Sequence, residues 1–384
     1  MSTALAAGLA QRHQQHLYRT RRILQSPQGA EIVIDGRDYL SFCSNDYLGL
    51  ANHPLVIKAL QDGAARYGVG SGASHLITGH SAAHHALEEE LSEFTGRPRA
   101  LLFSTGYMAN LGVIGALVGP RDTIYEDRLN HASLVDAAIL SRARLRRYPH
   151  GDMTALENLL RRSESPALIA TDGVFSMDGD LAPVATLAEL ARTCNASLMI
   201  DDAHGLGVLG KTGRGVLEVL AINPDDVPIL MGTLGKAFGV FGAFVAGSEE
   251  LIETLIQQAR SYIYTTALPP AIAEAARMSL KLSQSEPWRR EHLHSLIARF
   301  RLGAAQLNIP IAASMSPIQP LIVGESEQAL ALSEKLYARG IVISAIRPPT
   351  VPKGRARLRI TLSAAHTEQH VDRLLEALSE VVAP

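Results

Sequence analysis

Short, continuous apolar segments recur between residues 100 and 246 of this 384-residue chain, often followed by a turn of small residues and a helical pattern. Strands with one exposed face alternate apolar and polar residues. These segments do not alternate, so we expect strands that are buried on both faces. The pattern predicts an α/β fold with a mainly parallel sheet covered by helices. The segments are residues 100–103, 123–125, 167–171, 197–200, 229–231 and 242–246.

The two ends of the chain have sequence patterns that differ from that of the central part. Residues 1–25 have the pattern of a polar helix, and Asp35-Gly36 predicts a hairpin turn between two short strands. After about residue 285, long helical stretches surround three short apolar runs, which predicts a smaller α+β domain. Those runs are residues 318–323, 341–344 and 357–360. We therefore expect an N-terminal arm over residues 1–45, a large domain over 46–285 and a small C-terminal domain over 286–384.

Composition and charge exclude several classes of protein. The 36 Lys and Arg residues nearly balance the 38 Asp and Glu residues, which argues against a protein that binds nucleic acid or a membrane surface. No apolar run reaches the ~18 residues that a membrane-spanning helix needs. Cys43 and Cys194 are too few for a disulfide framework or a cysteine metal site, so we expect a cytoplasmic protein without a bound metal.

Lys236 has an unusual setting for a lysine, because it lies among small residues directly after the apolar run 229–231. An amine in such a place can hold a carbonyl carbon as a Schiff base. The alternative is a lysine whose stem covers apolar surface while its charge reaches water. A P-loop is excluded, because Leu230 and Ala237 stand where that motif needs glycine and Ser or Thr.

Asp201 ends an apolar segment, at the edge of an α/β sheet where ligands bind. A buried carboxylate is costly unless a cation meets it. A protonated pyridine nitrogen would be such a cation for Asp201, if Lys236 held the aldehyde group of the same pyridine molecule. An arginine partner or a helix-capping role for Asp201 remains the alternative.

Two segments of the sequence contain glycines of the kind that occur in anion-binding loops. Gly106-Tyr107 follows the segment 100–103 and opens a helical pattern, and the start of a helix binds anions through its free backbone N–H groups. The glycines between residues 68 and 79 do not form a dinucleotide-binding fingerprint, because His75 stands at the third glycine position.

Taken together, Gly106-Tyr107, residues 201–204 and residues 233–236 resemble the pyridoxal-phosphate enzymes of fold type I, and more narrowly the α-oxoamine synthases. The resemblance covers about residues 15–375. It implies a seven-stranded sheet, pyridoxal 5′-phosphate as cofactor and a homodimer with its active site at the subunit interface. Further blocks in the family's order are residues 44–49, 130–133, 172–179 and 264–270.

The resemblance also implies roles for individual residues. Lys236 would form the Schiff base and remove the α-proton of the amino acid, Asp201 would keep the ring nitrogen protonated, and His131 would stack on the ring. Other residues would hold the ring hydroxyl and the phosphate, two of the threonines from a second subunit. These are Ser176 and His204 for the hydroxyl, and Gly106, Tyr107, Thr233, Thr265 and Thr266 for the phosphate.

For the substrates, the resemblance points to Asn45 and Arg359 at the amino-acid carboxylate and to Arg19 and Thr350 at the acyl substrate. Arg357 and Arg359 are two apart on a predicted strand and therefore face one way. A bidentate arginine suits a carboxylate. The alternatives are that these two arginines line a solvated sheet face and that Arg19 belongs to a solvated helix end.

Within the family, residues 345–352 look most like the members that condense L-alanine with a pimeloyl thioester, carried by coenzyme A or by acyl carrier protein. The alternatives are a glycine-using member such as 2-amino-3-ketobutyrate CoA ligase and an aminotransferase of the same fold. His75 departs from the family pattern and leaves open how the acyl chain is held. The arginines at positions 142, 144, 146 and 147 form a solvated face or a docking surface for acyl carrier protein.

Overall fold

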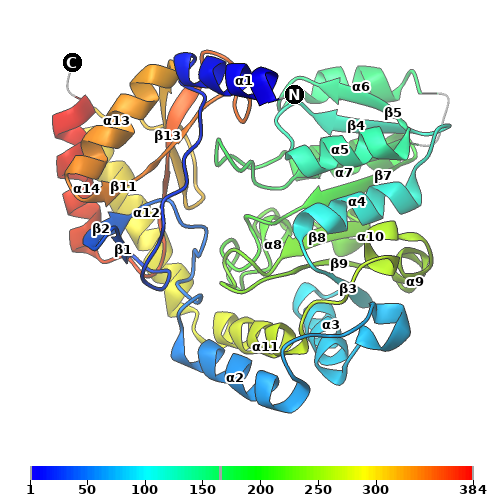
Figure 1. Cartoon of the computed structure of the whole chain (residues 1–384). Helices are drawn as coiled ribbons and strands as arrows, with labels where there is room; N and C mark the ends of the chain where they lie inside the picture. The colour runs from blue at the N-terminus through cyan, green and yellow to red at the C-terminus, as the bar shows by residue number, and fades with distance from the viewer. Residues whose placement is uncertain (1, 164–166, 383–384) are drawn as a thin grey trace. The chain divides into compact units, whose positions relative to one another are not determined.

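The computed structural model describes residues 2–163 and 167–382 (Figure 1). Its contacts divide the chain into two compact units, each built from segments that are far apart in the sequence. One unit contains residues 53–176 and 181–290, and the other contains residues 1–52, 177–180 and 291–384. The N-terminal segment thus belongs to the same unit as the C-terminal segment.

A seven-stranded sheet forms the centre of the 53–290 unit, with strand order β3-β9-β8-β7-β6-β4-β5. The ladders between β4, β5, β6, β7 and β8 are parallel, and only β9 runs antiparallel to its neighbours. The predicted mainly parallel seven-stranded sheet is therefore confirmed. The strands are β3 (Arg99–Phe103), β4 (Thr123–Asp127), β5 (Arg144–Tyr148), β6 (Ala167–Asp172), β7 (Ala196–Asp201), β8 (Ile229–Thr233) and β9 (Ala243–Gly247).

Helices cover both faces of this sheet, which is why its inner strands are apolar on both sides. Side chains of α4, α5 and α9 pack with Leu101 and Phe103 on one face, whereas those of α3 and α11 pack with Leu102 on the other. Helices α6 and α7 extend that second layer. The longer helices of the unit are α2 (Pro54–Tyr67), α3 (Ala82–Thr95), α4 (Gly106–Leu117), α5 (Ala132–Ser141), α6 (Met153–Leu160), α7 (Val184–Thr193), α9 (Glu249–Gln258) and α11 (Pro270–Ser285). Short α8 (Val216–Val219) and α10 (Arg260–Ile263) and a π-helical turn, His75–Gly79, complete it.

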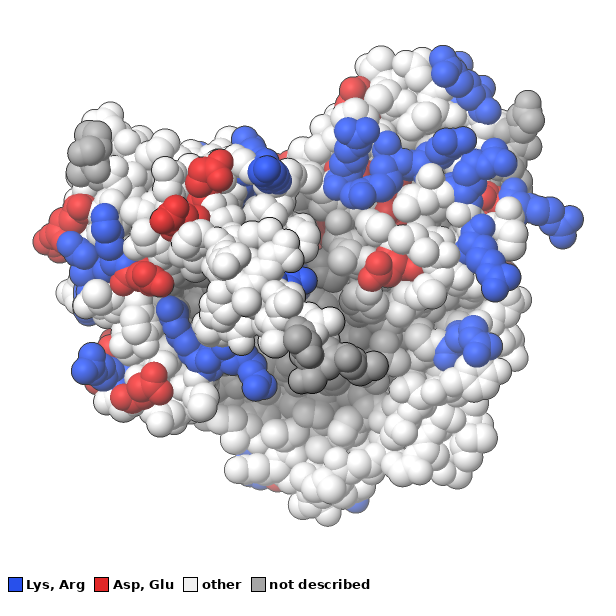
Figure 2. All heavy atoms as spheres, turned by 45° about the horizontal axis from the view of Figure 1, so that its top comes forward, with Lys and Arg blue, Asp and Glu red and all other residues white. Residues whose placement is uncertain are grey.

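Strand β5 was not predicted, because its sequence Arg-Leu-Arg-Arg-Tyr is charged rather than apolar. It lies at the edge of the sheet, where one side of the strand meets no neighbour and exposed side chains are tolerated. The surface over β4, β5 and α6 accordingly carries several positively charged side chains (Figure 2), all of them arginines because residues 121–163 contain no lysine.

The other unit contains two three-stranded sheets. In the first, the N-terminal hairpin β1 (Glu31–Ile34) and β2 (Arg37–Ser41) pairs with β11 (Ile341–Val342), so the two ends of the chain share one sheet. In the second, β13 (Ala356–Thr361) lies between β10 (Ile318–Gly324) and β12 (Ser344–Ile346). The helices of this part are α1 (Ser2–Gln14), α12 (Trp288–Gln306), α13 (Ser326–Ala338) and α14 (Glu368–Val382).

Two predictions for this unit were wrong in detail. The polar helix at the N-terminus ends at Gln14, well before residue 25, and His16 adopts a left-handed backbone with φ of 55° that does not continue a helix. The apolar run 341–344 is not one strand, because its two halves join different sheets as β11 and β12. Within the described residues, no helix combines the length and the apolar character needed to cross a membrane.

Candidate active site

Seven of the predicted cofactor residues line one cavity of about 160 Å³ in the unit that holds the large sheet. The cavity lies where β6, β7 and β8 end, as expected for a ligand site at the carboxyl edge of a parallel sheet. The predicted residues that line it are Gly106, Tyr107, His131, Asp201, His204, Thr233 and Lys236. Asn110, Ser133, Asp172, Ala203 and Met231 complete the lining.

Lys236 follows β8 and is half-buried. Its Nζ lies 2.8 Å from Nε2 of His204, which follows β7 on the neighbouring strand. The amine therefore points to a ring nitrogen inside the cavity rather than to bulk water. This position does not fit the alternative of a lysine that merely covers apolar surface.

Asp201, the last residue of β7, is 4% exposed, and its carboxylate receives only neutral donors. Its Oδ2 accepts a hydrogen bond from Nδ2 of Asn110 at 2.8 Å, and its Oδ1 accepts one from the backbone N–H of Ala203 at 3.1 Å. Among the described residues, no arginine or lysine forms an ion pair with it. A carboxylate this deeply buried gains most from a cationic N–H placed in the cavity.

Asn110 and Ser133 connect Asp201 to His131. The amide Nδ2 of Asn110 also donates to Oγ of Ser133 at 2.8 Å, and Oγ lies 2.7 Å from Nδ1 of His131. The backbone N–H of Ser133 donates to the same Nδ1 at 3.2 Å, so Nδ1 is the unprotonated ring nitrogen and a proton belongs on Nε2. Burial lowers the pKa of His131, although the charge of Asp201 opposes that shift. The imidazole is thus held neutral and in one orientation.

A second buried carboxylate lies beside Asp201. Asp172 ends β6 directly opposite Asp201 in the strand register, and its Oδ2 accepts the backbone N–H of His131 at 2.7 Å. Burial raises the pKa of Asp172 well above its usual value, and the charge of Asp201 raises it further. Two adjacent carboxylates do not both ionise readily in a dry site.

The start of α4 supplies the anion site that the sequence suggested. Thr105 caps this helix by accepting the backbone N–H of Met108 at 3.2 Å, which leaves the N–H groups of Gly106 and Tyr107 for a ligand. A Cβ at position 106 would lie 3.1 Å from Cε of Met231, so only glycine fits here without a shift of that side chain. The hydroxyl of Thr233 donates to the carbonyl of Gly242 at 3.1 Å.

Three predicted cofactor residues do not line the cavity. Ser176 is half-buried after β6, Thr265 is half-buried, and Thr266 is exposed. Among the described residues, the hydroxyl of Thr265 contacts only the carbonyl of Thr266, at 3.5 Å. A role for these two threonines therefore depends on a second subunit.

The predicted carboxylate-binding residues meet within the other unit. Nη1 of Arg359 donates to Oδ1 of Asn45 at 3.2 Å, and its Nη2 lies 3.4 Å from the hydroxyl of Tyr47. The exposures of Arg357 and Arg359 are 1% and 6%, so the alternative of a solvated sheet face is wrong. The Arg357 guanidinium is neutralised by Asp178 at 2.6 Å.

The two predicted acyl-substrate residues are also in contact. Nη2 of Arg19 donates to Oγ1 of Thr350 at 3.1 Å, and both side chains are exposed. Arg347 donates to the carbonyls of His16 and Tyr18, the latter at 3.2 Å, and so ties the segment before Arg19 to the loop that carries Thr350.

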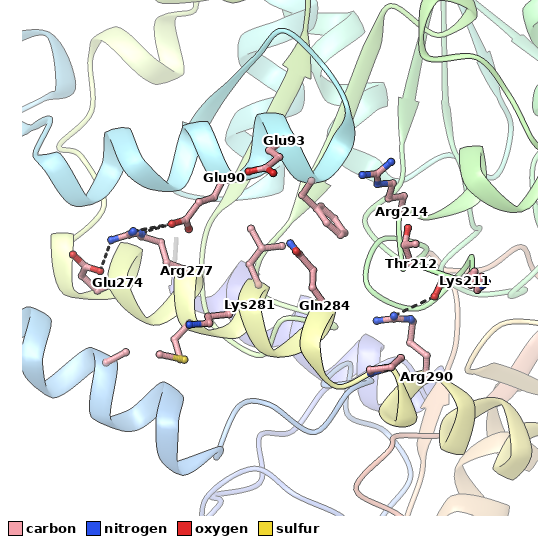
Figure 3. A pocket seen from close by; sticks show the side chains of 15 residues that line it. Glu90, Glu93, Lys211, Thr212, Arg214, Glu274, Arg277, Lys281, Gln284 and Arg290 are labelled. Atoms are coloured by element: carbon pink, nitrogen blue, oxygen red, sulfur yellow. Dashed lines mark hydrogen bonds and ion pairs between the residues drawn. The ribbon is translucent and has the colours of Figure 1, made fainter.

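A larger cavity, of about 800 Å³, lies between α3, α11 and residues 211–214 (Figure 3). Some of its polar side chains bond to other residues of its lining. Arg277 bonds to Glu90 at 2.7 Å and to Glu274 at 2.9 Å, and Arg290 donates to the carbonyl of Lys211 at 3.2 Å. None of the predicted site residues lines this cavity, so we do not take it as the active site.

Comparisons with known proteins give the family. Residues 37–378 match the model of the class I and II aminotransferases. The chain is 62% identical over 380 residues to the 8-amino-7-oxononanoate synthase of Stutzerimonas stutzeri, which covers 99% of this chain and 97% of that protein.

Solved structures agree with this assignment. The 8-amino-7-oxononanoate synthase of Francisella tularensis is 34% identical with a TM-score of 0.78, over 90% of this chain and 98% of that one. Serine palmitoyltransferase from S. paucimobilis, solved with a bound PLP–myriocin aldimine, is 28% identical with a TM-score of 0.93, over 98% of this chain and 96% of that one.

Pyridoxal phosphate is the cofactor of this family, and the cavity fits it on its own geometry. A lysine amine, a buried carboxylate with only neutral donors, and free N–H groups at a helix start surround one space. By family model, by relatives over nearly its full length and by fold, the chain belongs to the 8-amino-7-oxononanoate synthases, pyridoxal-phosphate-dependent acyltransferases within the class I and II aminotransferase family.

Proposed function

We propose that this chain joins L-alanine to a pimeloyl thioester, with loss of carbon dioxide and of the thiol, and that the residues around Lys236 and Asp201 carry out the chemistry. The observation that supports this most is the setting of Asp201, whose buried carboxylate forms no ion pair with an arginine or lysine among the described residues and lines the same cavity as the Lys236 amine. Bound pyridoxal phosphate supplies an electron sink for the carbanion that forms at the α-carbon.

Lys236 is the proposed catalytic base. Its amine would hold the cofactor aldehyde, and it is the group placed to take the α-proton of alanine. Nε2 of His204, 2.8 Å from Nζ, holds the amine in position for that transfer. The loop 234–239 keeps the side chain half-buried, which limits the access of water to the proton.

Asp201 and His131 are the proposed partners of the cofactor ring. The Asp201 carboxylate would hold the proton on the ring nitrogen, and the two hydrogen bonds from Asn110 and Ala203 fix its oxygens. The His131 imidazole, fixed through Ser133, would contact the ring. Gly106, Tyr107 and Thr233 would hold the phosphate, and His204, with Ser176 from outside the cavity lining, would hold the ring hydroxyl.

For the amino acid, Arg359 is the proposed carboxylate ligand. Asn45 and Tyr47 orient its guanidinium. A guanidinium binds a carboxylate through paired hydrogen bonds. Burial raises the pKa of Tyr47, so its hydroxyl stays neutral beside the arginine. Arg19 and Thr350 are the proposed contacts of the acyl group, whether coenzyme A or acyl carrier protein delivers it.

We also propose that the active enzyme is a homodimer located in the cytoplasm. Thr266 and Tyr264 are both exposed, Tyr264 by 70%, so this segment is accessible to a partner subunit. A partner subunit would bring Thr265 and Thr266 to the phosphate. The two cysteines are unpaired, which suits a reducing compartment.

The test is a reaction of the purified holoenzyme with L-alanine and pimeloyl-CoA. The proposal predicts release of free thiol and carbon dioxide in equal amounts, with glycine a much poorer substrate than alanine. Transfer of the amino group without thiol release would instead indicate an aminotransferase. Faster turnover with glycine and a short-chain acyl-CoA would indicate the glycine-using relatives.

A further inference from the structure

A second, smaller cavity in the large-sheet unit is lined by arginines. It has a volume of about 290 Å³ and lies at the amino ends of β4 and β5, whereas the cofactor cavity lies where the parallel strands end. Arg144 and Arg146 of β5 and Arg162, just after α6, contribute its charge, and Thr123 and Tyr125 of β4 form the wall beside them.

The strand register explains why these side chains share one space. Thr123 pairs with Arg144, and Tyr125 pairs with Arg146, and residues two apart on a strand face the same side of the sheet. The Tyr125 hydroxyl donates to the carbonyl of Leu159 at 3.3 Å, which ties the end of α6 to β4. The chain after that point brings Arg162 over the same face.

The side chains of the three arginines have no partners among the described residues. Within residues 2–163 and 167–382, the guanidinium groups of Arg144, Arg146 and Arg162 form no hydrogen bond or ion pair, and no carboxylate lines the cavity. Their neighbours are different, because Arg161 bonds to Glu157 at 2.6 Å and Arg147 donates to the carbonyl of Arg128. Three guanidinium groups without a partner among the described residues therefore share this one cavity.

Protection of the sheet edge is a simpler explanation for charge on β5. Charged side chains on an edge strand discourage pairing with another chain. Protection of the edge needs charged side chains on the strand, but it does not require them at particular positions. It does not explain why the same-face arginines of β5 line a cavity together with a third arginine from a different element.

We propose that this cavity binds a small phosphorylated ligand at a site separate from the cofactor cavity. Guanidinium groups bind phosphate oxygens through paired, charge-assisted hydrogen bonds, and three of them around one space match the charge of a pyrophosphate or phosphomonoester. The volume is close to the lower end of small-molecule sites, ~300 Å³, and suits a small anion better than a protein segment.

The test is calorimetric titration of inorganic pyrophosphate into the holoenzyme, in which cofactor already fills its own phosphate site. The triple variant Arg144→Gln/Arg146→Gln/Arg162→Gln should bind pyrophosphate at least about tenfold more weakly. The matched control is Arg161→Gln, which removes one neighbouring charge outside the cavity and should bind within about twofold of the parent. Binding by the parent should also weaken as salt is raised.

Three results would overturn the proposal: no pyrophosphate binding by the parent, equal binding by the parent and the triple variant, or equal loss in Arg161→Gln. Turnover with alanine and pimeloyl-CoA gives a separate readout, and kcat and KM should be unchanged in the triple variant. A higher KM for pimeloyl-CoA in that variant would assign the arginines to the thioester's own phosphates and contradict a separate site. Because binding is measured without turnover, failure of the proposed reaction would leave this result intact.

Discussion

Nδ2 of Asn110 lies 2.8 Å from Oδ2 of Asp201 and 2.8 Å from Oγ of Ser133. One buried amide therefore holds the carboxylate and, through the serine, the His131 imidazole. Asn110 is completely buried, and its own Oδ1 has no hydrogen-bond partner in the part of the chain that the structure describes. The residue thus fixes two groups that are proposed to contact the cofactor, although it was not among the residues predicted from sequence.

Asn110→Ala should lower kcat by about tenfold to a hundredfold, the range expected when a hydrogen bond to a charged group worth ~1.5–3 kcal/mol is lost. The KM for pimeloyl-CoA should change little. The visible absorbance of bound cofactor should persist but change its dependence on pH, because Asp201 loses a donor. Steady-state kinetics and a pH series of spectra check this, with Asn110→Gln as the variant that retains an amide. Unchanged spectra and kinetics in Asn110→Ala would contradict the role.

Asp201→Asn should retain cofactor but lose at least about a hundredfold in kcat, because an amide does not hold a proton on the ring nitrogen. Each pKa unit that Asp201 adds to that nitrogen is worth ~1.4 kcal/mol, so a shift of two units gives this loss. Asp201→Glu retains the charge and should recover part of the rate. Cofactor content by absorbance and kcat under saturating substrates measure both effects. Equal rates in the parent and in Asp201→Asn would exclude the proposed pair.

Arg359→Lys should raise the KM for alanine by about tenfold or more, because a lysine cannot form the paired hydrogen bonds of a guanidinium with a carboxylate. The KM for pimeloyl-CoA serves as the internal control and should stay within about twofold. Varying each substrate at a fixed saturating level of the other separates the two constants. A parallel rise of both KM values would indicate general damage instead of a lost alanine contact.

Because His366 is buried, we expect the free energy of unfolding to fall at acid pH. Its Nε2 lies 2.9 Å from the carbonyl of Ser41, its Nδ1 accepts the N–H of Ser363 at 2.9 Å, and burial lowers its pKa to about 4. The unfolded chain, with a pKa near 6.5, binds the proton more tightly than the fold does. The contribution of His366 to the free energy of unfolding should therefore be constant above about pH 6.5 and fall as the pH drops toward 4.

Denaturant unfolding at several pH values, with parent and His366→Gln compared, isolates this group. The parent should lose more stability than the variant between pH 6.5 and 4, at ~1.4 kcal/mol per unit of pKa difference. A constant difference between the two proteins over that range would show that His366 does not titrate as stated.

Much of the fold could be predicted because buried parallel strands have a distinctive apolar sequence. The segments at residues 167–171 and 197–200 correspond to β6 and β7 in the centre of the sheet. Edge strand β5 has no such apolar sequence, since exposed arginines are tolerated at an edge as well as apolar residues are. The parallel pairing of β2 with β11, some 300 residues later, depends on contacts that local sequence does not encode.

The same distinction holds for the candidate site. Lys236, Asp201 and His204 could be predicted, because each follows an apolar strand and belongs to a recognisable block. Asn110 lies inside an ordinary helical pattern and acts on residues 23 and 91 positions away. No local property marks an asparagine whose partners lie on other elements, so only the folded structure reveals it.

The account depends on a covalent bond between Lys236 and the cofactor aldehyde, and borohydride reduction tests it most directly. Holoenzyme should be reduced by borohydride and digested, and the peptides analysed by mass spectrometry. The account predicts a pyridoxyl phosphate adduct on the peptide that contains Lys236 and no adduct in Lys236→Ala. An unmodified Lys236 in fully cofactor-loaded protein, or an adduct on another lysine, would contradict it.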